Sequence, residues 1–108
     1  MYYTGIDIGS TSAKAVVLNK NSEIIYKDVM PTGWSSLETA NRIKENLAEV
    51  GVKVDNSKFL ATGYGRVSVP YANKTVTEIT CHGKGAAYLF NTDACTVIDI
   101  GGQDTKII

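Results

Sequence analysis

A nine-residue motif occurs twice in the chain, once near each end. Residues 6–14 read IDIGSTSAK and residues 98–106 read IDIGGQDTK. The two segments align without gaps and share Ile-Asp-Ile-Gly and the final Lys. In each copy an apolar β-branched run enters a small-residue loop, which is typical of a strand that turns into a hairpin. Any fold for this chain must therefore provide places for two similar strand–turn units.

The aspartates of the repeat, Asp7 and Asp99, are the first candidates for chemistry. An Asp between two isoleucines on a strand is costly to bury unless it meets a cation or hydrogen-bond donors. The Gly that follows lets backbone N–H groups approach an anion. A carboxylate beside a Gly-rich turn suits Mg²⁺ with phosphate, and two such hairpins facing each other would clamp a polyphosphate. The alternative is that each Asp-x-Gly only makes a tight turn, which is common for one copy but is not favoured for two matched copies.

The spacing of apolar residues predicts an α/β protein. Strands are expected at residues 3–8, 13–19, 24–29, 59–62, 75–77 and 96–100, with a break in the third at residues 30–33. Ser35 and Glu38 form a capping box for a helix that Gly51 ends, and a second helix is expected over residues 78–90. Three meandering strands followed by parallel crossovers predict a mixed sheet.

Composition and length exclude several classes of protein. The chain has 108 residues, which suits one modest domain, and its 11 Lys and Arg balance 11 Asp and Glu. Without a basic excess we expect no nucleic-acid partner and no attachment to an anionic membrane surface. The start lacks the pattern of a signal peptide, which predicts a cytoplasmic protein. Two cysteines without C-x-x-C spacing do not suggest a disulfide scaffold.

The second copy of the repeat leads to an expectation about domain organisation. It ends at Lys106-Ile107-Ile108 without a stop signal, so its hairpin is expected to lack a return strand. Apolar residues at a terminus are an unusual end for a domain. We therefore expect an N-terminal lobe over residues 1–94, the start of a second lobe over residues 95–108, and a longer parent protein.

Several motifs resemble known ATPases. Residues 5–11 and 97–102 resemble the two phosphate motifs of the actin, Hsp70 and sugar-kinase superfamily. Within it, ATGYGR at residues 61–66, EITCHGKGA at 78–86 and DIGGQDTK at 99–106 resemble one family. That family comprises the ATP-dependent activators of 2-hydroxyacyl-CoA dehydratases and the ATPase subunits of benzoyl-CoA reductases.

The resemblance implies a ribonuclease-H-like, actin-like ATPase lobe followed by the first strand of a second similar lobe, with ATP bound between them. It implies a homodimer that shares one [4Fe-4S] cluster and takes an electron from a donor such as ferredoxin or flavodoxin. ATP hydrolysis would drive that electron to the acyl-CoA dehydratase or reductase. The cluster ligands and the adenosine site are expected beyond Ile108, so these 108 residues are expected to supply no cluster ligand and to be inactive alone.

The resemblance also implies roles for individual residues. Asp7, and Asp99 or Asp104, would be carboxylates on the magnesium side, with Lys14 adding positive charge. The small residues of the two loops would surround phosphate: Gly9, Ser10, Thr11, Ser12, Gly101 and Gly102. Gln103 would orient the attacking water. Glu78 would position water or would only complement the start of a helix.

Two alternative functions remain open from the sequence. One is a sugar or acetate kinase of the same superfamily, and the other is a non-catalytic nucleotide-sensing or filament-forming module. The loop carrying Tyr64 and Arg66 is interpreted as lying near the cleft or a partner surface. Cys81 and His82 are adjacent on a predicted helix and point in different directions, which favours packing over a metal site.

Overall fold

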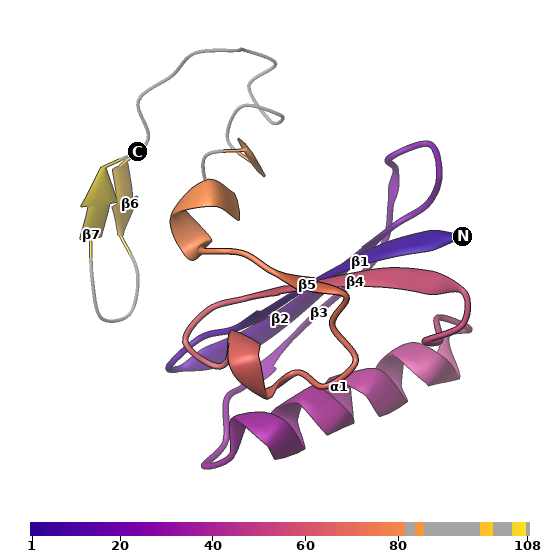
Figure 1. The fold of residues 1–108 in the computed structure, drawn as a ribbon, viewed down its shortest axis with the longest axis horizontal. Helices are drawn as coiled ribbons and strands as arrows, with labels where there is room; N and C mark the ends of the chain where they lie inside the picture. The colour runs from indigo at the N-terminus through magenta and orange to yellow at the C-terminus, as the bar shows by residue number, and fades with distance from the viewer. Residues whose placement is uncertain (82–83, 86–97, 101–104, 108) are drawn as a thin grey trace.

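The structure is a computed structural model that describes residues 1–81, 84–85, 98–100 and 105–107 (Figure 1). Its elements in chain order are β1 (Tyr2–Ile8), β2 (Ser12–Leu18), β3 (Ile24–Pro31), α1 (Ser36–Glu49), β4 (Ser57–Thr62), the 3₁₀ turn η1 (Arg66–Ser68), β5 (Lys74–Thr75), β6 (Ile98–Ile100) and β7 (Thr105–Ile107). Residues 78–81 and 84–85 are helical, and the remainder of the helix predicted over 78–90 lies outside the described residues. No helix in this described portion is long and apolar enough to cross a membrane.

Five strands form one mixed sheet in the order β3-β2-β1-β4-β5. The pairs β1–β2 and β2–β3 are antiparallel, whereas β1–β4 and β4–β5 are parallel, as the predicted meander and crossovers require. The third strand was expected to break at residues 30–33. This position is wrong, because β3 continues through Met30 and Pro31. The strand lies at the edge of this sheet, where a proline without an N–H group is tolerated.

Helix α1 covers one face of the sheet (Figure 1). Its N-cap is Ser35, whose Oγ accepts a hydrogen bond of 3.2 Å from the backbone N–H of Glu38, so the predicted cap is confirmed. The core between helix and sheet is formed by buried apolar side chains: Ile6, Ile8, Ala13, Ala15, Val17, Ala40, Ile43, Leu47, Val52, Phe59, Ala61 and Val69. Since side chains alternate along a strand, the residues between these core positions lie on the opposite face of the sheet.

The second copy of the repeat forms a hairpin of its own. β6 and β7 pair antiparallel as a two-stranded sheet, with Asp99 opposite Lys106. The expectation that this copy lacks a return strand is therefore wrong, because residues 105–107 already pair back onto β6. Because antiparallel strands need only a short connection, a return strand can already begin at Thr105.

Candidate functional site

Asp7 lies at the end of β1, opposite Lys14 of β2. The Lys14 Nζ donates a hydrogen bond of 3.2 Å to Asp7 Oδ2. The side chain of Asp7 is 22% exposed and that of Lys14 is 43% exposed, so solvent weakens this ion pair and it adds little stability. The structure thus brings together the predicted magnesium-side carboxylate and the predicted phosphate-side cation at one end of the sheet.

The other carboxylate oxygen of Asp7 is in a different environment. Asp7 Oδ1 is buried and has no hydrogen-bond partner among the residues that the structure describes. An unpartnered buried carboxylate oxygen is unfavourable, and a cation or hydrogen-bond donor at this position would compensate it. Mg²⁺ takes oxygen ligands of this type, so the carboxylate of Asp7 fits the ion that the repeat predicts.

The loop between β1 and β2 is a tight turn. The backbone N–H of Gly9 donates to the carbonyl of Ser12 at 3.0 Å, and a Cβ at Gly9 would lie 2.8 Å from that same carbonyl oxygen. Ser10 and Thr11 at its tip are exposed. Their backbone and hydroxyl groups are therefore accessible to a ligand, as a phosphate loop requires.

Thr32, just after β3, braces this loop. Its N–H donates to the carbonyl of Thr11 at 3.1 Å, and its hydroxyl donates to the carbonyl of Gly9 at 2.8 Å. Thr32 is not among the residues predicted from the sequence, because no local pattern indicates that a threonine 23 positions after Gly9 returns to it.

The ATGYGR segment lies against the same end of β1. A Cβ at Gly63 would overlap both the Ile8 carbonyl oxygen and Asp7 Oδ1, and the φ of Gly63 is +89°. The N–H of Gly65 donates to the Ile8 carbonyl at 3.0 Å, and Arg66 Nη1 donates to the Gly63 carbonyl at 3.0 Å. The glycines thus allow this loop to pack directly against the carboxylate of Asp7. In the sequence, only the ATGYGR motif indicated that this loop lies near the site.

The other predicted site residues lie on or beyond the shorter elements. Asp99 is on β6, and its pairing with Lys106 repeats the register of Asp7 with Lys14. Glu78 starts the helical residues 78–81, and Cys81 is half-buried. Some predicted residues lie outside the described residues: His82, Gly101, Gly102, Gln103 and Asp104.

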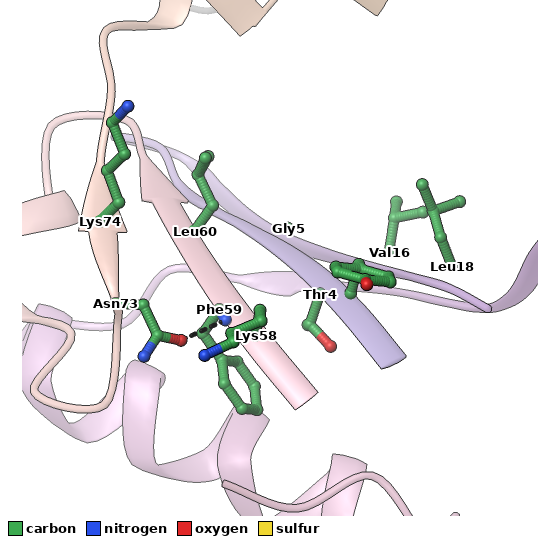
Figure 2. Close-up of a pocket in the computed structure, with 10 residues that line it drawn as sticks. Thr4, Gly5, Val16, Leu18, Lys58, Phe59, Leu60, Asn73 and Lys74 are labelled. Carbon is green, nitrogen blue, oxygen red and sulfur yellow. Dashed lines mark hydrogen bonds between the residues drawn. The ribbon is translucent and has the colours of Figure 1, made fainter. Parts of the chain in front are cut away.

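An apolar pocket of about 410 Å³ lies over β1, β2 and β4 (Figure 2). Tyr3, Val16, Leu18 and Leu60 contribute to its lining. None of the predicted site residues that the structure describes is among the ten that line it. The ten described lining residues include no carboxylate, so the pocket does not suit a metal–phosphate ligand, and the end of the sheet at Asp7 is the candidate site.

Comparisons with known proteins identify the family of this chain. The model of the BadF/BadG/BcrA/BcrD ATPase family matches residues 4–108. The chain is 41% identical over 109 residues to the activator of lactoyl-CoA dehydratase from Anaerotignum propionicum. It is also 41% identical over 110 residues to the (R)-2-hydroxyglutaryl-CoA dehydratase activating ATPase from Acidaminococcus fermentans. Each of these two matches covers 100% of this chain and 42% of the relative, so the chain spans about two fifths of the length of these proteins.

Two solved structures are similar over the same region. The crystal structure of component A of the Acidaminococcus fermentans (R)-2-hydroxyglutaryl-CoA dehydratase gives a TM-score of 0.86 at 40% identity, covering 100% of this chain and 42% of that one. The activator of the 2-hydroxyisocaproyl-CoA dehydratase from Clostridium difficile with bound ADPNP gives a TM-score of 0.84 at 32% identity. The match covers 99% of this chain and 40% of that one. The fold is that of a ribonuclease-H-like lobe of actin-like ATPases. The chain belongs to the BadF/BadG/BcrA/BcrD ATPase family.

Proposed function

We propose that this chain forms the first nucleotide-binding lobe of an ATP-hydrolysing activator. The longer protein would couple ATP hydrolysis to transfer of a low-potential electron to a 2-hydroxyacyl-CoA dehydratase or a benzoyl-CoA reductase. The observation that carries the proposal is the carboxylate of Asp7, which has one oxygen paired with Lys14 and the other buried without a partner at the end of β1. Relatives named as dehydratase activators match the chain over its entire length.

In this proposal the β1–β2 hairpin is the first half of a phosphate clamp. Asp7 would hold Mg²⁺, directly or through water, and the ion would neutralise charge that develops on the phosphates. Lys14 and the exposed loop residues Ser10 and Thr11 would bind phosphate oxygens. Thr32 would keep the loop in shape, because both of its hydrogen bonds join the loop to the end of β3.

The β6–β7 hairpin would supply the second half. Asp99 has the same register position as Asp7, which supports an equivalent role on the magnesium side, with Asp104 as the alternative carboxylate. Gly101 and Gly102 would approach phosphate, and Gln103 would orient the attacking water. Glu78, at the start of the helical residues 78–81, would position water or complement the helix dipole.

The remaining parts of the proposal concern the whole protein. It would be a cytoplasmic homodimer holding one [4Fe-4S] cluster, reduced by a donor such as ferredoxin or flavodoxin. Two cysteines in each protomer would provide the four thiolates that a cluster normally needs only if Cys81 and Cys95 of both protomers met at one point, so the cluster ligands would lie outside these 108 residues.

Purified full-length protein tests the function. We expect magnesium-dependent hydrolysis of ATP, and we expect a cognate dehydratase to become active only when the protein, ATP and a reductant are all present. Transfer of the γ-phosphate to a sugar or acetate would indicate a kinase instead. Nucleotide binding without hydrolysis or dehydratase activation would indicate a sensing module.

A further inference from the structure

Two residues paired in register at the candidate site each have a buried oxygen without a hydrogen-bond partner among the described residues. Thr62 is the last residue of β4, and its register partner on β1 is Asp7. Asp7 lies between the core positions Ile6 and Ile8, and Thr62 follows the core position Ala61, so both side chains are on the face of the sheet opposite the core. Thr62 is 6% exposed, and neither its Oγ1 nor Asp7 Oδ1 has a hydrogen-bond partner within the described residues.

The other buried hydroxyls in the described part of the chain have hydrogen-bond partners. At the opposite end of the same two strands, Thr4 Oγ1 and Ser57 Oγ are 2.8 Å apart and share a hydrogen bond. On α1, the Thr39 hydroxyl donates to the Ser35 carbonyl at 3.0 Å. A buried hydroxyl without a partner costs about 1–3 kcal/mol, so two unpartnered oxygens on neighbouring strands point to a bound group that they share.

The chemistry of the two oxygens defines that group. A carboxylate oxygen only accepts hydrogen bonds, whereas a threonine hydroxyl both donates and accepts. A water molecule between them would donate one hydrogen to Asp7 Oδ1 and would make its second bond with Thr62 Oγ1. Asp7 Oδ2 is already held by Lys14, so this water would restrain the carboxylate at both oxygens.

We infer that Thr62 is a positioning residue of the magnesium–nucleotide site. Its hydroxyl and Asp7 Oδ1 hold one water between β1 and β4, and this water fixes the orientation in which the carboxylate of Asp7 meets Mg²⁺. Gly63 contributes by lacking a Cβ, which would otherwise overlap Asp7 Oδ1. The inference rests on the proposed function, and it assigns a role to a residue that does not itself contact the nucleotide.

Three variants of the full-length protein test this role. Thr62→Val keeps the shape of the side chain and removes its hydroxyl, while Thr62→Ser keeps the hydroxyl. Thr4→Val is the matched control, because it removes a buried hydroxyl from the same strand pair but one that has a partner. For each we measure ADP affinity with and without Mg²⁺ by calorimetry, the Mg²⁺ concentration for half-maximal ATP hydrolysis, and the thermal midpoint.

We expect Thr62→Val to weaken the magnesium-dependent part of ADP affinity and to raise the Mg²⁺ requirement, each by about tenfold or more, as outer-sphere partners of metal ligands do. Its magnesium-free affinity should stay at the wild-type level, and its thermal midpoint should fall less than that of Thr4→Val, because the Thr62 hydroxyl is held by a water and the Thr4 hydroxyl by Ser57. Thr62→Ser should resemble the wild type. Thr4→Val should lower the midpoint and keep the wild-type Mg²⁺ requirement.

Thr62→Val with the magnesium dependence of the wild type overturns the inference. So does Thr62→Ser with a defect as large as that of Thr62→Val, because the hydroxyl would then not be the cause. If the wild-type protein itself binds ADP without any effect of Mg²⁺, the proposed function fails rather than the role of Thr62 alone.

Discussion

The two copies of the repeat form hairpins with the same register but with different surroundings. In β1–β2, Asp7 lies opposite Lys14, and in β6–β7, Asp99 lies opposite Lys106. The first hairpin is part of a five-stranded sheet, whereas the second is a two-stranded sheet in the described part of the chain. A local motif therefore specifies the hairpin, and neighbouring strands specify the environment of its carboxylate.

Strand β4 makes the difference at the first hairpin. It pairs with β1 and places Thr62 and Gly63 against Asp7, and these contacts bury one of the carboxylate oxygens. β4 is held in turn by the core, where Phe59 and Ala61 are buried under α1. The environment of Asp7 thus depends on packing well away from the site.

The largest effect is expected from removing the charge of each aspartate. Asp7→Asn and Asp99→Asn, each made in the full-length protein, should lower kcat for ATP hydrolysis about a hundredfold to a thousandfold and should change nucleotide affinity far less. A carboxylate that holds the metal acts mainly on charge that develops during transfer. Steady-state kinetics and calorimetry on both variants provide the measurement. A large loss in only one variant would show that the hairpins are not equivalent halves of a clamp.

A smaller effect is expected from crowding the contact between β4 and Asp7. Gly63→Ala adds a Cβ that overlaps the Ile8 carbonyl and Asp7 Oδ1 at a φ of +89°, so we expect the free energy of unfolding to fall by about 3 kcal/mol. Gly51→Ala is the matched control, because Gly51 has a φ of +88° but nothing within 4 Å of the added Cβ. Its cost should be about 1 kcal/mol, from backbone strain alone.

Urea unfolding of the two glycine variants makes the comparison. Equal destabilisation would mean that backbone strain dominates at both positions and that the contact with Asp7 contributes nothing. Gly63→Ala should also impair the Mg²⁺ dependence of nucleotide binding, and Gly51→Ala should leave it unchanged.

The smallest effect is expected from Tyr71, which ties β4 to α1. Its hydroxyl donates to the Ala40 carbonyl, and its ring meets Phe59 edge to face with centroids 5.1 Å apart. Burial raises the pKa of Tyr71 above its ordinary value of 10.0. The folded state then keeps this proton at pH values where the unfolded chain loses it, so the contribution of Tyr71 to stability is present below pH 10 and falls as the pH rises beyond it.

Tyr71→Phe removes both the hydrogen bond and the titrating group. At pH 8 we expect a loss of about 1 kcal/mol in the free energy of unfolding, since one hydrogen bond is removed. Between pH 9.5 and about pH 11 the variant should lose less stability than the wild type. Denaturant unfolding at these pH values measures the difference, and parallel losses in the two proteins would contradict the role given to burial.

Several features followed from the sequence because their causes are local. The repeat predicted a strand followed by a turn at each copy, because an apolar β-branched run before a short Gly-containing turn is a local signal. The cap at Ser35 and the end of α1 near Gly51 were predicted for the same reason. The structure added the return strand β7 and the pairing of each aspartate with a lysine. The ATGYGR motif indicated the family, but its spacing alone did not show where the loop would lie.

Only the tertiary structure decided what surrounds Asp7. Thr62 is separated from Asp7 in sequence by the whole of β2, β3 and α1, and it reaches Asp7 because β4 pairs in parallel with β1. Thr32 reaches Gly9 because β3 pairs with β2, and β3 tolerates Pro31 because it is an edge strand. Partners of this kind depend on which strands become neighbours, and no local period or turn signal encodes that choice. The sequence determined that this chain carries two aspartates, each on a strand that enters a Gly-containing turn. The pairing of β1 with β2 placed Lys14 on one oxygen of Asp7, and the packing of β4 against β1 left the other oxygen buried without a partner among the described residues, because strands far apart in sequence became neighbours.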